Sequence, residues 1–599
     1  MILIFGGTTE GRVAAEVCEM AGKPYYYSTR SAMQDVELHN GVRLSGALTL
    51  SDIMSFCSAN GVRCIIDAAH PFAEHLHHTI DQTHLPVIRL QRHFGDKVDE
   101  AVYCNDYADA MRLMEKSGVN RLLVLSGANT ISKLQPWWSE HPSVFRILHR
   151  EESITVAKRC GLPMENVIFY NDALQLPTKE EEQDMMRSAG CDAMITKESG
   201  ENGGFRNKVQ AALSLGMKVF VVKHPPLPSH WHYVTGPHSL RRAIEHTVPE
   251  FFPLHTGLTT GACATAATKA ALLSLLYGER VEEVSFALPD DEVMTVPVEL
   301  EGIGRASVVK DQSDDPDVTK GCRITSVVAR NGCGTIRFLQ GDGVGTVTLP
   351  GLGIPMGGPA INVTPRRMME REIRALSDEG FDVTISVADG AALAQKTFNP
   401  KVGVVGGISI IGTSGIVSPL SNEAFIQSIG RELEVARAIG CTEIGIVAGK
   451  KSEEFLQRLY PKLRMIHYGN FVGETLKKAR ALSFERVVVG IMIGKAVKLA
   501  EGNLDTHSHK VVMNKAFLKD LVVSMAADGI LDAAADANEN QRLAETYIRE
   551  INNITMAREL TSFMPPSFFS RIETLCHNHC QKVFPDGEIK IILICDGQV

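Results

Sequence analysis

The stretch Met1-Ile2-Leu3-Ile4-Phe5-Gly6-Gly7-Thr8-Thr9-Glu10-Gly11 opens the chain with an apolar run that leads into a glycine-rich turn. This order is typical of the first strand and first loop of a nucleotide-binding α/β fold. Glycines let the backbone approach a ligand closely, and the amides of a following helix can hold an anion. The turn does not match G-x-G-x-x-G, so a tight strand-to-helix turn without a ligand is the alternative interpretation.

A second glycine-rich loop lies in the sequence Gly406-Gly407-Ile408-Ser409-Ile410-Ile411-Gly412-Thr413-Ser414-Gly415, after the apolar run of residues 402–405. The same physical argument applies to it, because a strand that feeds a glycine-rich turn brings backbone amides close to a ligand. Two such loops, separated by a stretch of different character, predict two active sites in one chain.

The bulk composition limits the class of protein. A chain of 599 residues is too long for one core, and we expect three to five domains of roughly 150 residues each. The 13 cysteines lack disulfide-framework spacing and the N-terminus lacks a signal-peptide pattern, so we expect a reduced, cytoplasmic protein. No apolar run approaches the roughly 20 residues that span a bilayer. The net charge of −9 disfavours a general nucleic-acid surface.

The pattern along the chain predicts a multidomain α/β protein. Residues 1–248 alternate apolar strands with helices, as in parallel sheets covered on both faces. A break near Gly118 divides them into lobes of about 1–118 and 119–248, with a ligand cleft between the lobes. After a short junction with two prolines, residues 254–599 divide into an α+β part (about 254–395), a Rossmann-like α/β part (about 396–510) and a mainly helical part (about 511–599). The strands expected in the first half are residues 2–5, 64–67, 87–90, 121–125, 193–196 and 219–222.

Polar residues follow several of the expected strands in the first half. His70 comes after strand 64–67, and Lys197 and Ser199 come after strand 193–196. Ligands bind at the carboxyl ends of strands in α/β sheets, so these residues are candidates for a site. Arg30, after the second expected strand, favours NADPH because an arginine there can bind a 2′-phosphate, although an exposed arginine without a role is nearly as good an interpretation.

No metal site is predicted. The histidines His75, His77 and His78 lack a completing cysteine or carboxylate at metal-ligand spacing, which favours a solvated helix face. Near the C-terminus, the spacing of Cys576 and Cys580 does not match the usual zinc patterns either, and we expect a helix there.

Three motifs of the first half occur in a recognisable order. Gly-Gly-Thr-x-Glu at the N-terminus, Asp-Ala-x-His-Pro-Phe-Ala from Asp67 and Thr-Lys-x-Ser-Gly from Thr196 resemble the precorrin-6A reductases, the CobK/CbiJ family, over about residues 1–247. The family reduces a corrin-precursor macrocycle with a nicotinamide cofactor. The resemblance implies that the cleft is faced by His70, Lys197 and Ser199, and that the cofactor site is lined by Gly6, Gly7, Thr8 and Glu10. Residues 42–47 depart from the glycine-rich stretch that the family often has.

The second half contains a dense carboxylate cluster in Lys-Asp-Gln-Ser-Asp-Asp-Pro-Asp-Val-Thr, residues 310–319. A solvated loop, a divalent-cation site and a general base are all compatible with it. Thr259 and Thr260 precede an alanine-rich helix, where hydroxyl groups form caps or anion sites. Arg366 and Arg367 lie at a helix start, where basic residues oppose the helix dipole unless an anion is bound.

These motifs closely resemble the CbiD family when they are taken with the second glycine loop, Tyr468-Gly469-Asn470, Lys495 and Thr506-His507. CbiD proteins are cobalt-precorrin-5B C-1 methyltransferases of the anaerobic cobalamin pathway, and the match runs from about residue 254 to the C-terminus. The resemblance implies S-adenosyl-L-methionine as the methyl donor, bound by Gly406, Gly407, Ser409, Gly412, Thr413 and Gly415. Catalytic roles would fall to Asp311, Asp314, Asp315 and His507.

A corrin precursor carries acetate and propionate arms, so its rim needs cationic and amide donors. Residues that fit this role are Thr259, Thr260, Asn362, Arg366, Arg367, Asn470, Lys495 and Lys498.

The sequence therefore predicts a bifunctional enzyme of corrin-ring biosynthesis. It would methylate cobalt-precorrin-5B with S-adenosyl-L-methionine and then reduce the resulting cobalt-precorrin-6A with NADPH or NADH. Its partner would be the small-molecule macrocycle, with no nucleic acid and no membrane; a homo-oligomer is compatible with the sequence. The alternatives are a Rossmann-type dehydrogenase fused to an unrelated α/β domain, and a non-enzymatic tetrapyrrole carrier.

Overall fold

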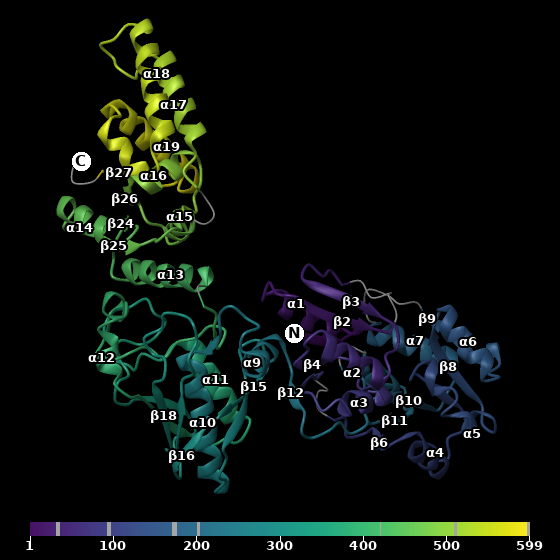
Figure 1. The fold of residues 1–599 in the computed structure, drawn as a ribbon. Coiled ribbons are helices and arrows are strands. Elements are labelled where there is room, and N and C mark those ends of the chain that lie inside the picture. The colour runs from purple at the N-terminus through teal and green to yellow at the C-terminus, as the bar shows by residue number, and fades with distance from the viewer. Residues whose placement is uncertain are drawn as a thin grey trace. The chain divides into compact units, whose positions relative to one another are not determined.

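The computed structural model describes residues 1–30, 36–92, 97–170, 177–200, 204–419, 421–507 and 512–595. Its internal contacts define two units. Unit 1 comprises Met1–His255 with Asp291–Thr295, and unit 2 comprises Thr256–Asp290 with Val296–Val599. Helices alternate with strands throughout (Figure 1), and the N-terminal part contains parallel sheets, as the predicted α/β class requires. None of the helices in the described ranges is long and apolar enough to cross a membrane.

Unit 1 begins with a parallel sheet of six strands in the order β12-β5-β4-β1-β2-β3. The strands are continuously apolar because helices cover both faces, and Ile2, Leu3 and Ile4 are fully buried. The strands are β1 (Ile2–Phe5), β2 (Tyr25–Thr29), β3 (Gly41–Ser45), β4 (Cys64–Asp67), β5 (Val87–Leu90) and β12 (His232–Val234). The helices are α1 (Thr9–Glu19), α2 (Leu50–Ala59), α3 (Glu74–Asp81) and α9 (Pro237–Thr247).

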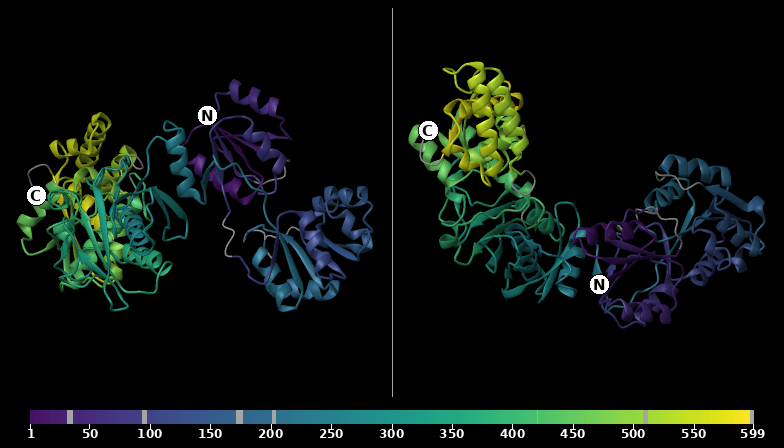
Figure 2. Two further views of the ribbon diagram at one scale, coloured as in Figure 1. Left: turned by 90° about the horizontal axis from the view of Figure 1, so that it is seen from below. Right: turned by 45° about the horizontal axis from the view of Figure 1, so that its top comes forward.

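A second parallel sheet of six strands completes unit 1, in the order β6-β11-β10-β7-β8-β9. Figure 2 shows the two sheets, each with its own helices. The strands are β6 (Val102–Cys104), β7 (Leu122–Val124), β8 (Ser143–Leu148), β9 (Val167–Tyr170), β10 (Ala193–Lys197) and β11 (Lys218–Val222). The helices are α4 (Tyr107–Lys116), α5 (Gln135–Trp138), α6 (Glu151–Arg159), α7 (Lys179–Ala189) and α8 (Phe205–Ser214).

The predicted lobe boundary at Gly118 is wrong. Strand β6 already pairs with β11, and α4 packs into the core of the second sheet. Gly118, with a φ of 61°, forms the turn that ends α4. Strand β12 and helix α9 then return to the first sheet. The chain crosses between the sheets twice, whereas the sequence pattern indicated a single break.

Unit 2 begins with a sheet in the order β16-β17-β18-β21-β19 that packs on the alanine-rich helix α10 (Thr260–Tyr277). Helix α11 (Val363–Arg374) also contacts α10, and small side chains let these neighbours approach it closely. The sheet strands are β16 (Glu299–Gly302), β17 (Arg305–Val309), β18 (Arg323–Arg330), β19 (Ile336–Gln340) and β21 (Phe381–Val387). The short strand pairs are β13 (Gly257–Leu258) with β23 (Ile416–Val417), β14 (Glu283–Ala287) with β15 (Val293–Pro297), and β20 (Thr346–Val347) with β22 (Val404–Val405).

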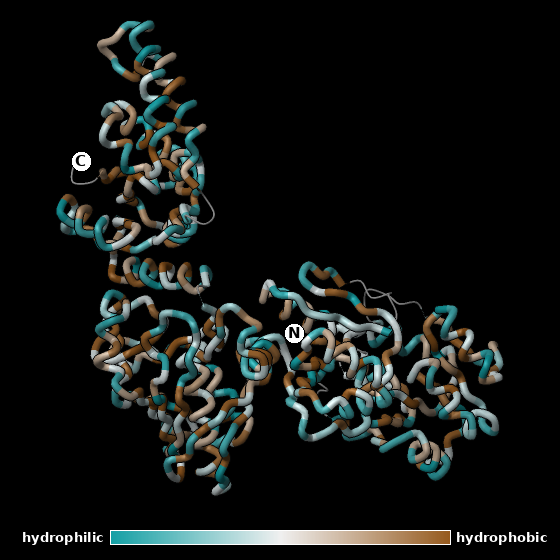
Figure 3. The backbone as a smooth tube through the Cα atoms, in the orientation of Figure 1, coloured by the Kyte–Doolittle hydropathy of each residue, from teal (hydrophilic) through white to brown (hydrophobic). Residues whose placement is uncertain are grey.

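The rest of unit 2 is built on a parallel sheet in the order β25-β24-β26-β27. The last strand of the chain pairs with β26, and the C-terminal helices share one hydrophobic core with the sheet. Apolar and polar residues alternate along helices such as α13 (Figure 3). The strands are β24 (Glu443–Val447), β25 (Arg464–His467), β26 (Arg486–Met492) and β27 (Glu588–Ile594). The helices are α12 (Gly390–Ala394), α13 (Asn422–Ala438), α14 (Lys450–Leu459), α15 (Val472–Ala481), α16 (Ile493–Ala500), α17 (Lys515–Ala527), α18 (Ala537–Asn553) and α19 (Pro566–Val583).

The second glycine loop does not have the predicted strand–turn–helix surroundings. Strand β22 is only Val404–Val405 and pairs antiparallel with β20, outside the parallel sheet. The next helix, α13, begins only at Asn422. The glycines serve packing instead: a Cβ at Gly407 would lie 2.4 Å from the Gly343 carbonyl oxygen, and one at Gly412 would lie 2.2 Å from Thr259 Oγ1.

Candidate functional sites

The first glycine turn, between β1 and α1, has one closed and one open glycine. Gly6 donates its N–H to the Ser28 carbonyl at 2.9 Å, and a Cβ there would lie 2.3 Å from the Tyr27 ring. Gly7 has a φ of 93°, and no atom lies within 4 Å of the position its Cβ would take. Thr8 accepts from the Gly11 N–H at 3.1 Å and donates to the Ala68 carbonyl at 2.6 Å. The turn is therefore rigidly held, with open space on the side of Gly7.

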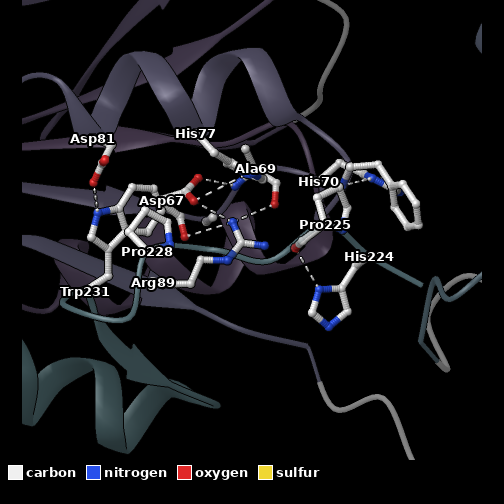
Figure 4. A network of polar contacts seen from close by, with 12 residues as sticks. Asp67, Ala69, His70, His77, Asp81, Arg89, His224, Pro225, Pro228 and Trp231 are labelled. Carbon is white, nitrogen blue, oxygen red and sulfur yellow. Dashed lines mark hydrogen bonds and ion pairs between the residues drawn. The ribbon is translucent and has the colours of Figure 1, made fainter. Parts of the chain in front are cut away.

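A buried ion pair fixes the segment that carries His70 (Figure 4). Arg89, at 1% exposure, lies 2.8 Å from the Asp67 carboxylate and donates to the Ala69 carbonyl at 2.9 Å. Nε2 of His77 lies 3.5 Å from the same carboxylate. The predicted solvated position of His77 is wrong, since the residue is only 3% exposed and belongs to this network.

His70 and Lys197 come together from the strand ends of the two sheets. His70 Nδ1 accepts from the Phe72 N–H at 3.2 Å, and Lys197 Nζ lies 5.0 Å from the centre of the Phe72 ring. Burial, with the nearby charges of Arg92 and Lys197, lowers the pKa of His70 to about 4. Burial, with Lys133, lowers the pKa of Lys197 to about 8. Near neutral pH the pair therefore consists of a neutral imidazole and an ammonium group that is close to its titration range.

Arg92 is a site residue that the sequence reasoning missed. It follows β5 by two residues, lies 2.9 Å from the Glu10 carboxylate and donates to the Ser199 carbonyl at 3.1 Å. It thereby joins Glu10 and Ser199, which were predicted separately. The strand-end rule that selected His70 would also have selected Arg92. Arg30 is exposed at the end of β2, and residues 31–35 beside it lie outside the described residues.

In unit 2, Thr259 and Thr260 hold the second glycine loop. Thr259 Oγ1 accepts from the Ala262 N–H at 3.1 Å and caps α10, while its N–H donates to the Gly415 carbonyl at 2.9 Å. Thr260 Oγ1 accepts from the Ile411 N–H at 2.9 Å. The structure thus brings together two groups of predicted residues, in contacts within the protein itself.

The acidic loop is only partly solvated. The Asp311 carboxylate accepts from the Leu258 N–H at 2.7 Å. Nζ of the buried Lys310 lies 2.9 Å from the carboxylate of Asp317. Asp314 is exposed and Asp315 is half-buried. Two of the carboxylates thus support the fold, which leaves Asp314 and Asp315 as the more accessible candidates for the predicted catalytic role.

Four predicted residues of unit 2 gather at the carboxyl ends of β25 and β26. Lys495 Nζ donates to Asn470 Oδ1 at 2.9 Å and to the Gly469 carbonyl. Lys498 Nζ donates to the Thr506 carbonyl at 3.3 Å, and the N–H of Thr506 donates to the Asn470 carbonyl at 2.9 Å. His507 follows directly in the chain. Burial, with Lys498, lowers the pKa of Lys495 to about 8. This edge is where α/β sheets bind ligands.

A second titratable group at the end of β25 was not predicted. The Glu453 carboxylate lies 2.9 Å from Lys401 Nζ and 2.8 Å from His467 Nε2. Burial raises the pKa of the nearby Glu432 to about 7, although Lys401 and Arg464 oppose the shift. His467 directly precedes the Tyr468-Gly469-Asn470 motif, so the strand-end rule would have found it. Glu453 and Lys401 come from distant segments and carry no local signal.

The predicted residues at the start of α11 are arranged differently. Arg366 donates to the Ile361 carbonyl at 2.8 Å and lies over the Phe338 ring, 5.2 Å from its centre. Arg367 is exposed, and Asn362 is the residue that precedes α11. Within the described ranges, no recorded contact joins Arg366 or Arg367 to the Asn470 and Lys495 group. The structure therefore does not gather all the predicted rim residues in one place.

Two groups of strand-end residues, one in each unit, are the arrangement of an α/β enzyme with two sites. The family model of the precorrin-6x reductases CbiJ/CobK matches residues 1–246, and that of CbiD matches residues 248–419. A cobalt-precorrin-5B C(1)-methyltransferase of Prosthecochloris aestuarii (strain DSM 271 / SK 413) is 41% identical over 362 residues, which are 57% of this chain and 94% of that protein.

Two solved structures are also similar to parts of the chain. The cobalamin biosynthesis protein cbiD from Archaeoglobus fulgidus is 29% identical, covers 43% of this chain and 83% of its own, and has a TM-score of 0.25. A CobK precorrin-6A reductase is 19% identical, covers 41% of this chain and 97% of its own, and has a TM-score of 0.34.

The chain belongs to the CbiD family of cobalt-precorrin-5B C(1)-methyltransferases, and it carries a CbiJ/CobK reductase domain in front of the CbiD domain. The predicted resemblance to both families is confirmed.

Proposed function

We propose that this chain performs two consecutive steps of corrin-ring assembly. Unit 2 methylates C-1 of cobalt-precorrin-5B with S-adenosyl-L-methionine, and unit 1 then reduces cobalt-precorrin-6A to cobalt-precorrin-6B with NADPH or NADH. The observation that carries the proposal is that each unit has its own polar group at the carboxyl edge of a parallel sheet. His70 and Lys197 lie in unit 1, and Asn470 and Lys495 lie in unit 2. The names of the matched families support the substrate class.

For the reduction, the residues of unit 1 supply a nucleotide site and a proton. The open side of Gly7 and the first amides of α1 suit a pyrophosphate. A nicotinamide nucleotide bound there supplies the hydride. Lys197 is the candidate proton donor, because its pKa of about 8 keeps it protonated but acidic near neutral pH. His70 is neutral and accepts a backbone hydrogen bond at Nδ1, so it presents an N–H at Nε2 for substrate orientation.

For the methyl transfer, positioning should supply most of the rate, because the methyl group passes in line from a sulfonium to a ring carbon. Lys495 and Lys498 can hold the carboxylate arms of the macrocycle. Gly406, Gly407, Ser409, Gly412, Thr413 and Gly415 stay a prediction for the donor site. The carboxyl edge of the sheet is the second candidate, since nothing lies within 4 Å of a Cβ at Gly449 or Gly494.

Binding of S-adenosyl-L-methionine by calorimetry distinguishes the two candidate donor sites. Gly494→Val places a side chain at the sheet edge, and Gly406→Val places one in the loop; neither ideal Cβ position has a neighbour within 4 Å. The donor site lies where the substitution eliminates binding while the melting temperature stays close to that of the wild type.

The proposed activities are tested by incubating the protein with cobalt-precorrin-5B and both cofactors while mass and absorbance are followed. We expect a gain of one methyl group that requires S-adenosyl-L-methionine, followed by a gain of two hydrogens that requires NADPH or NADH. A tetrapyrrole carrier would bind the macrocycle without a mass change. A Rossmann-type dehydrogenase would instead turn over a small alcohol or ketone.

A further inference from the structure

Arg92 connects three segments of unit 1 through one guanidinium group. Its Nη2 lies 2.9 Å from the Glu10 carboxylate in α1, and its Nη1 donates to the Ser199 carbonyl after β10 at 3.1 Å. The side chains of Arg92 and Glu10 are only 10% and 9% exposed. Nε of Arg92 is also buried and finds no acceptor among the residues that the structure describes.

The position of Glu10 creates an electrostatic conflict. Glu10 lies in the first turn of α1, whose N-terminal amides are the groups that suit a pyrophosphate. A carboxylate at this end of a helix is favourable without a ligand. It repels a second anion that approaches the same amides, and burial of Glu10 weakens the screening of that repulsion by water. An anion site with an uncompensated Glu10 would therefore oppose its own ligand.

We propose that Arg92 is the charge-compensating residue of the nicotinamide-nucleotide site: it neutralises Glu10 and so lets the pyrophosphate approach the N-terminus of α1. The inference rests on the proposed reductase function. The Glu10–Arg92 pair has no net charge, so the attraction between the helix amides and the pyrophosphate is retained. Arg92 acts through Glu10, which makes it a positioning residue.

The test is a double-mutant cycle on nucleotide affinity in the full-length chain, with NADPH and NADH as titrants. Arg92→Met should weaken NADPH binding at least about tenfold, because a buried negative charge then faces the pyrophosphate. Glu10→Gln should bind NADPH at least as tightly as the wild type. The double variant should return to within about threefold of the wild type, because the repelling charge is gone.

Salt dependence separates charge compensation from a structural role. Added salt should partly restore NADPH binding to Arg92→Met, because it screens the repulsion. The matched control is Arg146→Met, which removes another buried arginine whose guanidinium lies 2.7 Å from Glu182, in the second sheet. That variant should lower the melting temperature and leave NADPH affinity unchanged.

Unchanged affinity in Arg92→Met, or equal weakening in the single and double variants, would overturn the inference while leaving the reductase function intact. Failure of the wild-type protein to bind either nucleotide would overturn both.

Discussion

Lys197 and His70 are neighbours whose protonation states differ near neutral pH, since burial contributes to lowering the pKa of Lys197 to about 8 and that of His70 to about 4. If Lys197 supplies the proton, reduction should slow as the pH rises through about 8, where the ammonium form is lost. A pH–rate profile should show this limb in the wild type and in His70→Asn, and lack it in Lys197→Met. Persistence of the limb in Lys197→Met would assign the proton to another group.

The Lys310–Asp317 pair makes a prediction about stability. Burial alone would raise the pKa of Asp317, but Lys310 and hydrogen bonds from Thr319 hold that pKa below its usual value. Asp317→Asn leaves the buried Lys310 ammonium without its carboxylate, which should cost about 3–5 kcal/mol of unfolding free energy. The exposed Asp314→Asn is the control and should change it by no more than about 0.5 kcal/mol.

Urea unfolding at several pH values measures both variants. A carboxyl group with a lowered folded pKa stabilises the protein above its unfolded pKa and loses that contribution as the pH falls through its folded pKa. The difference in unfolding free energy between the wild type and Asp317→Asn should therefore be full at neutral pH and shrink in acid. A difference that is independent of pH would assign the effect to packing.

At the scale of elements, the two glycine loops differ although their sequences are alike. In the second loop a Cβ at Gly407 would lie 2.4 Å from the Gly343 carbonyl oxygen, whereas one at Gly406 meets nothing within 4 Å. Gly407→Ala should therefore lower the melting temperature more than Gly406→Ala, which carries only the cost of a φ of 81°. Equal melting temperatures in a calorimetric comparison would contradict a packing role for Gly407.

Sequence patterns predicted the buried strands well, because parallel strands covered on both faces are continuously apolar. The expected ranges for β1, β4, β5 and β24 agree with the structure. Strands β6 and β12, each of three residues, are too short for such a pattern. The run of residues 402–405 was assigned to a Rossmann-like strand, since apolarity alone does not distinguish a parallel sheet from a short antiparallel pair.

The candidate sites follow the same division. The strand-end rule found His70, Lys197, Asn470 and Lys495, which each follow a strand by a few residues at most. It could not pair Glu10 with Arg92 or Glu453 with His467, because the partners are separated by 82 and 14 residues in the chain. Only the folded topology brings such partners within contact distance.

At the scale of the whole molecule, unit 1 is not a continuous piece of chain. Glu292, in the hairpin that follows α10, belongs to unit 1 by its contacts. Its carboxylate accepts from the Ser239 N–H at 2.6 Å, from Ser239 Oγ at 2.7 Å and from the His238 N–H at 3.1 Å. It thereby satisfies the first turn of α9, which packs on the first sheet. The reductase fold thus depends on a residue that follows the family boundary near residue 247.

This dependence gives a prediction for the fused chain. Glu292→Ala removes the carboxylate that holds the start of α9, and should lower the stability of unit 1 by about 1–2 kcal/mol, as for loss of a helix cap. The control is Glu283→Ala, an exposed position on the same hairpin, for which we expect a change of no more than about 0.5 kcal/mol. Differential scanning calorimetry, with the transition of unit 1 assigned by its shift on addition of NADPH, measures both. Equal melting in the two variants would show that α9 does not need Glu292, and that the reductase half ends where the sequence families divide.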